Sequence, residues 1–391
     1  MRSERKRREK EELLVRQKEN KGKNGHYRII SIIYMLALFL FIGLMVWMNI
    51  LPICLLVAAL VTLGLITIFT VPVLFSEKGK LKRKKKACVV ACVMIIVLAG
   101  ISYYMAHTLA FLNSISGYIG DVDTDRKSIQ VDVTEEPFNI LVSGIEVTGD
   151  IKTVSRSDVN MVVTVDPRNK EILLTSIPRD YYIKLPSKNA MDKLTHTGNF
   201  GAEETIGAVE NLLDIEINYY VKVNYSTITN MVDAMGGIDI VSPYSFDTHG
   251  MSVYYHFDEG PIHLDGSHAL AYCRERKSWV DGDMRRNENQ QLVLEAMIKK
   301  ATKGTTILFK YGNILDSIKG TIETDMKKSD MTDLVKMQLK DMASWNINKQ
   351  AVKGTPQMAY CYSLGAEASV VARDDASVKA AFKEIERVMT I

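Results

Sequence analysis

The chain has 391 residues, enough for one membrane module and one sizeable domain, and 47 % of them are hydrophobic. Its net charge of +3 conceals two parts of opposite sign: residues 1–120 carry 18 Lys and Arg against 6 Asp and Glu, a net of +12, which leaves −9 for residues 121–391. The acidic C-terminal part argues against general polyanion binding, so the basic pI does not indicate nucleic acid as a partner.

Three apolar runs follow one another near the N-terminus, at residues 29–48, 53–75 and within 87–112. Each is long enough to cross a hydrocarbon core of about 30 Å, which takes about 20 residues in a helix. Almost no charge interrupts them, which favours membrane spans over buried core helices. The sequence therefore predicts a three-span transmembrane module over residues 29–112.

The basic residues between these runs predict the orientation of the module. Residues 1–28 form a basic N-terminal segment that includes Arg5–Arg8, and the link before the third run contains Lys82–Lys86. By the positive-inside rule both lie in the cytoplasm, so the chain after the third span lies outside the cell. The first run is too long for a signal-peptide core and is followed at once by a second span. We expect a multi-pass protein of the cell membrane with an extracellular C-terminal domain.

Residues 113–136 are polar and patternless and are expected to be an extracellular linker, followed by an extracellular domain at 137–391. Expected strands are 138–142, 160–165, 171–177, 219–223 and 238–241. Expected helices are 202–213, 225–235, 283–302, 306–318, 329–342 and 376–389. This alternation predicts an α/β domain with a central mixed sheet and helices on both faces. Beyond its helices, the segment from residue 305 onward carries no motif that we can interpret.

The cysteines divide between the two parts of the chain. Cys54, Cys88 and Cys92 fall inside the apolar runs, where a thiol behaves as a small apolar group. Cys273 and Cys361 fall in the outer domain, in a non-reducing setting. A disulfide between these two and a pair of separate buried thiols both remain open.

Arginines and carboxylates gather in one segment of the outer domain. Arg274 and Arg276 are two apart in a segment expected to be extended, so their side chains should point the same way. Asp283, Arg286 and Gln290 are spaced three and four apart and share one helix face. A salt-bridged helix surface is the alternative for this triplet alone. The combination favours a site, because clustered guanidinium groups suit phosphate oxygens.

Further charged residues stand at the ends of the expected strands, where α/β sheets bind ligands. Arg156 and Asp158 precede the second strand, Arg179 follows the third, and Glu146 follows the first. A simple turn after Pro178 and a solvated loop carboxylate are the alternatives for Arg179 and Glu146. Carboxylates beside arginines suggest a Mg²⁺ or Mn²⁺ ion that bridges phosphates, held by Glu146 and Asp158.

Other chemistries lack their signatures. The seven histidines are scattered and form no zinc-spaced pair. There is no Gly-x-Ser-x-Gly elbow and no Walker loop, which argues against serine-triad acyl transfer and P-loop nucleotide hydrolysis.

Several motifs occur together in a characteristic order between residues 137 and 300. They are Asn139-Ile-Leu-Val-Ser-Gly144, Arg156-Ser-Asp158, Ser176-Ile-Pro-Arg-Asp180, Asp192-Lys-Leu194, Tyr219-Tyr-Val-Lys-Val223, Leu264-Asp-Gly266, Ala269-Leu-Ala-Tyr-Cys-Arg-Glu-Arg276 and Asp283-x-x-Arg-x-x-x-Gln290. With the membrane module in front of them, they resemble the LytR–CpsA–Psr family.

The resemblance implies a three-layer α/β domain that transfers a polyprenyl-pyrophosphate-linked glycopolymer, such as teichoic acid or capsule, onto peptidoglycan. The lipid tail would occupy an apolar tunnel of the domain. Arginines and a divalent metal, Mg²⁺ or Mn²⁺, would stabilise the pyrophosphate leaving group.

The resemblance also assigns roles to individual residues. The pyrophosphate would be bound by Arg156, Arg179, Arg274, Arg276 and Arg286, supported by Gln290. Asp283 would orient the arginines, while Glu146 and Asp158 would hold the metal. Asp158 is also the candidate base, and with Arg179, Arg274 and Arg276 it makes up the expected catalytic set.

The chain departs from the usual family pattern in three places. Glu146 stands where the family commonly has Asp, which puts the metal geometry in doubt. Asn287-Glu288 replaces a stretch that is often Gly- and Arg-containing. The accessory domain of some three-span members is missing.

Two alternatives remain beside the transferase: a hydrolase that uses water at the same site, and a non-enzymatic membrane regulator or sensor. The cytoplasmic segments are too short for a helix-turn-helix domain.

Overall fold

The computed structural model describes residues 25–47, 53–76, 81–119, 129–148 and 151–390. The chain divides into two compact units, Met1–Leu109 and Ala110–Ile391. Four predicted segments lie wholly or partly outside the described residues: most of the basic N-terminus at 1–24, the link between the first two apolar runs at 48–52, the start of the link before the third run at 77–80, and the middle of the linker at 120–128.

The structure contains the three helices that the apolar runs predict: two lie in the first unit, and the third begins there and extends past Leu109. They are Gly25–Trp47, α2 (Ile53–Phe75) and α3 (Leu81–Ile119), and each contains a stretch long and apolar enough to cross a membrane. Tyr34 Oη hydrogen-bonds Thr67 Oγ1 at 2.8 Å between the first two helices. The basic run Lys82–Lys86 forms the first turns of α3, and this helix continues to Ile119. The segment expected to be a linker from residue 113 therefore begins as helix.

The second unit is built on one mixed sheet of six strands in the order β11-β6-β1-β2-β3-β12. Its strands are β1 (Phe138–Ile145), β2 (Ser157–Asp166), β3 (Glu171–Ile177), β6 (Tyr219–Asn224), β11 (Ile322–Thr324) and β12 (Asn346–Ala351). The central β1-β2-β3 meander is antiparallel, whereas β6 and β12 join it in parallel. The central strands carry valine, isoleucine or leucine side chains on both faces of the sheet. This composition suits strands in the middle of a sheet whose two faces are both covered.

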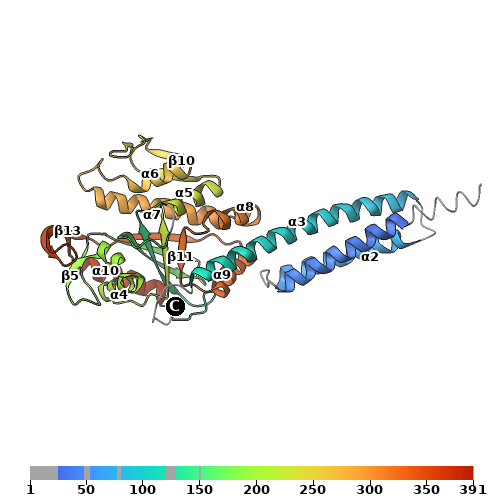
Figure 1. Cartoon of the computed structure of the whole chain (residues 1–391), viewed down its shortest axis with the longest axis horizontal. Coiled ribbons are helices and arrows are strands. Elements are labelled where there is room, and N and C mark those ends of the chain that lie inside the picture. The colour runs from blue at the N-terminus through green and yellow to red at the C-terminus, as the bar shows by residue number, and fades with distance from the viewer. Residues whose placement is uncertain (1–24, 48–52, 77–80, 120–128, 149–150, 391) are drawn as a thin grey trace, which may run out of the picture. The chain divides into compact units, whose positions relative to one another are not determined.

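Helices cover both faces of this sheet, as predicted. On one face Leu141, Val162 and Leu173 pack against α4 (Ala202–Leu213) and α10 (Asp375–Met389). On the other, their sequence neighbours Met161 and Leu174 pack towards α7 (Gly282–Ala301) and α9 (Lys328–Asp341). The alternation of strand side chains thus builds two cores from one sheet. Figure 1 shows α4 and α10 on the opposite side of the sheet from α7.

A further layer lies over α7. It consists of α5 (Tyr225–Ala234), α6 (Gly266–Arg274), α8 (Gly304–Ser317) and the pairs β7–β10 and β8–β9. The strands of these pairs are β7 (Ile238–Ser242), β8 (Phe246–Asp247), β9 (His256–Phe257) and β10 (Gly260–Leu264). Phe246, Phe257 and Tyr272 form its aromatic centre, with ring centroids 5.0–5.2 Å apart. A capping box between Asn224 and Thr227 starts α5 at the end of β6, which fixes where strand becomes helix.

The structure corrects two predictions about secondary structure. The segment around Arg274 is not extended: α6 ends at Arg274 and Arg276 lies in the turn before α7. The C-terminal region holds more than helices, because β12 joins the main sheet and β13 (Gly354–Cys361) pairs with β14 (Ala366–Arg373) as a hairpin. The short pair β4 (Tyr182–Lys184) and β5 (Met191–Lys193) was also not predicted.

Cys273 and Cys361 are both buried free thiols, so of the two open alternatives the structure contains separate thiols. Cys273 lies on the buried face of α6, and burial raises the pKa of its thiol to about 12. Cys361 lies in the hairpin, in another part of the unit.

The short helix η1 (Leu194–Phe200) packs directly against the start of β2, and Gly198 makes this approach possible. A Cβ atom at Gly198 would lie 2.5 Å from the carbonyl oxygen of Ser155 and 2.7 Å from the amide nitrogen of Ser157. We therefore expect Gly198→Ala to lower the free energy of unfolding by about 1–3 kcal/mol. Tryptophan fluorescence during denaturation of the full chain measures this. Gly207→Ala in α4 is the control: its Cβ would meet only Pro186, and we expect unchanged or higher stability.

Candidate active site

A cavity of about 290 Å³ lies between the main sheet and the helices above it. Its walls are almost entirely apolar and come from β1, β2, β6, α5, α6 and α7. On α7 the lining residues repeat every three or four positions, so one helix face forms one wall. They are Arg286, Gln290, Val293, Leu294, Met297, Ile298 and Ala301.

Charged and polar side chains gather at one end of this cavity. Glu146 follows Ile145, which pairs with Ser157 on one side and Asn224 on the other, so the ends of three strands meet there. Asp158 and Tyr225 are the next residues of the neighbouring strands, and Arg274 comes from the end of α6. An apolar chamber with a charged mouth suits an amphiphile that has a long apolar tail and an anionic head.

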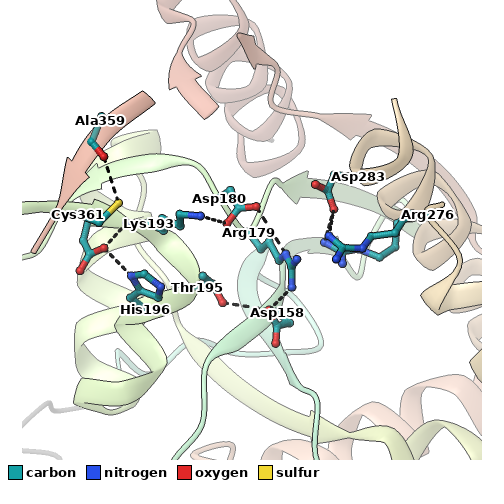
Figure 2. A network of polar contacts seen from close by, with 12 residues as sticks. Asp158, Arg179, Asp180, Lys193, Thr195, His196, Arg276, Asp283, Ala359 and Cys361 are labelled. Atoms are coloured by element: carbon teal, nitrogen blue, oxygen red, sulfur yellow. Dashed lines mark hydrogen bonds and ion pairs between the residues drawn. The ribbon is translucent and has the colours of Figure 1, made fainter. Parts of the chain in front are cut away.

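Asp158 is the buried centre of the charged mouth. Its side chain is 4 % exposed, and its Oδ1 accepts hydrogen bonds from Arg179 Nη1 at 2.8 Å and Thr195 Oγ1 at 3.2 Å (Figure 2). Burial alone would lower the pKa of Arg179, but the hydrogen bond and charge of Asp158 outweigh it and raise that pKa. Arg179 is therefore a permanent cation at the inner side of the site.

Asp283 stands between two arginines. Its Oδ1 lies 3.1 Å from Arg286 Nη2 and 3.4 Å from Arg276 Nη1. Arg286 is buried, and its Nε has no hydrogen-bond partner among the described residues. Burial and the nearby Arg179 lower the pKa of Arg286, which Asp283 opposes. A buried guanidinium with an unused donor is a group that an anionic ligand would satisfy.

Arg274 and Arg276 do not act as the same-facing pair that an extended segment predicts. The Arg274 guanidinium stacks on the Tyr225 ring, with its Cζ 4.5 Å from the ring centroid, and it lines the cavity. Arg276 turns to Asp283 instead. The helical end of α6 sends the two side chains to different partners, yet both reach the rim of the site.

The remaining predicted residues occupy the edge of the site. Gln290 lines the cavity and reaches the carbonyl oxygen of Cys273 at 3.5 Å. Arg156 is exposed, does not line the cavity, and makes no ion pair with any residue in the described ranges. Among the residues it describes, the structure therefore gives Arg156 no contact that would support its predicted role in pyrophosphate binding.

The donor atoms present fit a hydrated divalent cation. No group of three or more His, Cys, Asp or Glu side chains within the described ranges forms a closed metal cage. Glu146 and Asp158 both line the charged mouth, and Asp158 Oδ2 accepts no hydrogen bond from the residues described. Mg²⁺ is commonly held by one or two carboxylates, several waters and substrate phosphates, which matches this set.

Sequence reasoning missed Tyr225, Thr195 and Lys193. Tyr225 directly follows β6, so its place at the mouth could be found only once the parallel β1–β6 pairing was known. Lys193 belongs to the Asp192-Lys-Leu194 motif, which gave no role by itself, and Thr195 is the residue directly after that motif. In the structure Lys193 Nζ lies 3.0 Å from Asp180 Oδ1, in the network that Figure 2 shows around Arg179.

The Tyr225 hydroxyl lies buried at the mouth without a hydrogen-bond partner within the described part of the chain. Burial and the nearby Glu146 carboxylate raise the pKa of this phenol, so it stays a donor. We expect Tyr225→Phe to keep the Arg274 stacking and the stability of the fold while weakening binding of geranylgeranyl pyrophosphate about threefold to thirtyfold. Calorimetric titration measures the affinity. Unchanged affinity would contradict a ligand contact by this hydroxyl.

Comparisons with known proteins agree on one family. The model of the LytR_cpsA_psr family matches residues 108–378. A polyisoprenyl-teichoic acid–peptidoglycan teichoic acid transferase TagU from Halalkalibacterium halodurans is 37 % identical over 214 residues, 54 % of this chain and 68 % of the relative. The TagU of Bacillus licheniformis is 32 % identical over 265 residues, 66 % of this chain and 83 % of the relative. The crystal structure of Bacillus subtilis TagV superposes with a TM-score of 0.55 at 30 % identity, covering 65 % of this chain and 98 % of that one.

Proposed function

Since the chain belongs to the LytR–CpsA–Psr family, we propose that it transfers a glycopolymer from a polyprenyl-pyrophosphate carrier to a hydroxyl group of peptidoglycan. It is an enzyme of the transferase class. Teichoic acid is the polymer named for its relatives; capsule or another wall glycan would present the same pyrophosphate to the site.

One observation carries this proposal: the apolar cavity ends at a cluster of arginines and carboxylates. A free sugar nucleotide would not need the apolar chamber, and a simple lipid would not need the charged mouth. A polyprenyl pyrophosphate has both parts in the same order. Its tail would contact residues such as Met231 and Met297, and its phosphates would lie near Arg274 and Arg286.

The residues at the mouth suit transfer to a hydroxyl group. The acceptor oxygen forms a new bond to the glycan or to its terminal phosphorus, the bond between that atom and the lipid carrier's phosphate oxygen breaks, and the polyprenyl phosphate or pyrophosphate leaves with the electron pair. Arg179, Arg276 and Arg286 lie within the network of Asp158 and Asp283, so their guanidinium groups are held before the reaction. Each well-placed cation at a leaving phosphate contributes about 10²–10³ in rate. Asp158 is the candidate base for the acceptor proton.

A divalent cation would be held by Glu146 and Asp158, with Mg²⁺ or Mn²⁺ as the candidates. When bound, it would neutralise charge on the departing phosphates. The longer side chain of Glu146 reaches the mouth from the end of β1, and water would complete the coordination.

The three apolar helices support attachment to the cell membrane. We infer that the basic N-terminus is cytoplasmic and that the domain after α3 faces outward, from the basic residues before the first and third helices. Attachment keeps the domain beside a donor that also lies in the membrane, which raises the effective concentration of that donor.

The direct test mixes the full chain in detergent with a polyprenyl-pyrophosphate-linked oligosaccharide, peptidoglycan oligomers and Mg²⁺, and follows products by mass spectrometry. We expect a glycan–peptidoglycan adduct that disappears when a chelator removes the metal. Free glycan without an adduct would favour a hydrolase, and binding without chemistry would favour a sensor. The released lipid identifies the bond that breaks: polyprenyl pyrophosphate means the sugar–phosphate bond, and polyprenyl monophosphate means the phosphoanhydride, with one phosphate carried to the acceptor.

Replacing Arg274 tests the charged mouth without disturbing the core, because this side chain is exposed and stacks only on Tyr225. We expect Arg274→Ala to lower kcat/KM by about 10²–10³, and Arg274→Lys to recover part of the loss because it restores charge without the planar fork. Steady-state kinetics measure both. Arg373→Ala is the control, since Arg373 contacts Asp375 on the surface away from the cavity. Equal losses in Arg274→Ala and Arg373→Ala would contradict the assignment.

A further inference from the structure

The helix η1 brings a threonine hydroxyl to the buried carboxylate at the centre of the site. Thr195 is 3 % exposed, and its Oγ1 donates to Asp158 Oδ1 at 3.2 Å. The backbone of the same segment is fixed to the strand end beside it: Thr195 N donates to Arg179 O at 2.8 Å, and Leu194 N donates to Tyr181 O at 2.9 Å. Thr195 thus contacts both members of the Asp158–Arg179 pair.

A second buried carboxylate holds this segment in place. Asp192 has no solvent exposure; its Oδ1 accepts from Lys193 N at 2.8 Å and lies 2.6 Å from His196 Nδ1, and its Oδ2 accepts from Ser363 N at 2.8 Å. Burial alone would raise the pKa of Asp192, but the hydrogen bonds from Ser363 and His196 outweigh it and lower that pKa. A charged carboxylate therefore ties η1 to the β13–β14 hairpin.

The contacts of Asp158 divide sharply between its two oxygens. Oδ1 receives both Arg179 and Thr195, whereas Oδ2 receives no hydrogen bond from any residue that the structure describes. Two donors from different directions fix the rotation of a carboxyl group, which one donor alone would not do. The free oxygen belongs to a residue that lines the cavity.

We propose that Thr195 is a positioning residue, which fixes the carboxylate of Asp158 through Oδ1 and so keeps Oδ2 available for the metal ion or the acceptor proton. The proposal rests on the transferase function given above. Outer hydrogen bonds of this kind orient the groups that touch the ligand, and losing one typically costs 10–100-fold in metal affinity or activity.

A neighbouring threonine separates this role from simple packing. Thr197 is also buried in η1, but its hydroxyl donates to Leu194 O at 2.7 Å and lies 2.8 Å from Thr205 Oγ1, away from Asp158. Replacing either threonine with valine removes one buried hydroxyl and preserves the shape of the side chain. Only the Thr195 replacement removes a hydrogen bond to the site.

The experiment compares Thr195→Val, Thr195→Ser and Thr197→Val in the full chain in detergent. We expect Thr195→Val to lower kcat about tenfold with little change in the KM for the lipid-linked donor, and Thr195→Ser to recover most of that loss. Calorimetry with Mn²⁺ in the presence of geranylgeranyl pyrophosphate should show about tenfold weaker Mn²⁺ binding for Thr195→Val. Thr197→Val should lower the melting temperature and leave kcat and Mn²⁺ affinity unchanged.

Three results would overturn the proposal: wild-type kcat and Mn²⁺ affinity in Thr195→Val, an equal loss in Thr197→Val, or a serine variant as impaired as the valine variant. A wild-type chain that transfers no glycan would instead contradict the proposed function. In that event the Mn²⁺ affinities of the three variants still decide the role of Thr195.

Discussion

The ion pair between Asp158 and Arg179 is the interaction on which the rest of the site depends. Asp158 stands at the start of β2 and Arg179 just beyond the end of β3, and the antiparallel pairing of these strands brings the two together. Burying two charges is costly, and the pair is kept only where good geometry and further hydrogen bonds compensate. Thr195 supplies one of these further hydrogen bonds. The neighbouring Asp180 forms an ion pair with Lys193 and accepts a backbone hydrogen bond from Val371 of the hairpin.

The C-terminal region supports the site through the segments that carry this pair, although it does not line the cavity. Val371 N donates to Asp180 O, and Ser363 N donates to Asp192, so the β13–β14 hairpin closes the outer side of the segment that carries Arg179 and Thr195. Asp158 lines the cavity, whereas no residue of the hairpin does. The site therefore combines a hydrogen-bonded polar segment with an apolar chamber.

The sequence predicted the sheet and its covering helices well, because strands such as 171–177 and helices such as 202–213 carry strong local patterns. The prediction failed where the secondary structure of a segment depends on contacts with residues distant in the sequence. The segment before Arg276 resembles a strand in composition, but an Asp265 cap and burial against α7 make it helical. The polar strand β12 has no alternating pattern and is defined only by its pairing with β3.

The same limit applies to the site. Arg179, Arg286 and Asp283 could be proposed from motif and spacing, since strand ends and helix periodicity place them. Tyr225 could not, because its position follows from the parallel register of β1 and β6. Asp192 was inside a recognised motif and Thr195 directly followed it, but the roles of this buried carboxylate and this hydroxyl follow only from the atoms that they contact in the fold.

The length of α7 that lines the cavity indicates how much of an extended ligand the cavity can hold. From Arg286 at the charged mouth to Ala301 at the far end, one continuous helix lines the chamber over about 22 Å, at 1.5 Å for each residue. An extended polyprenyl chain longer than this would reach beyond the lined length of the chamber. Its distal isoprenyl units would then lie outside the chamber while its phosphates reach the arginines, so the protein would enclose only part of the lipid carrier during the reaction.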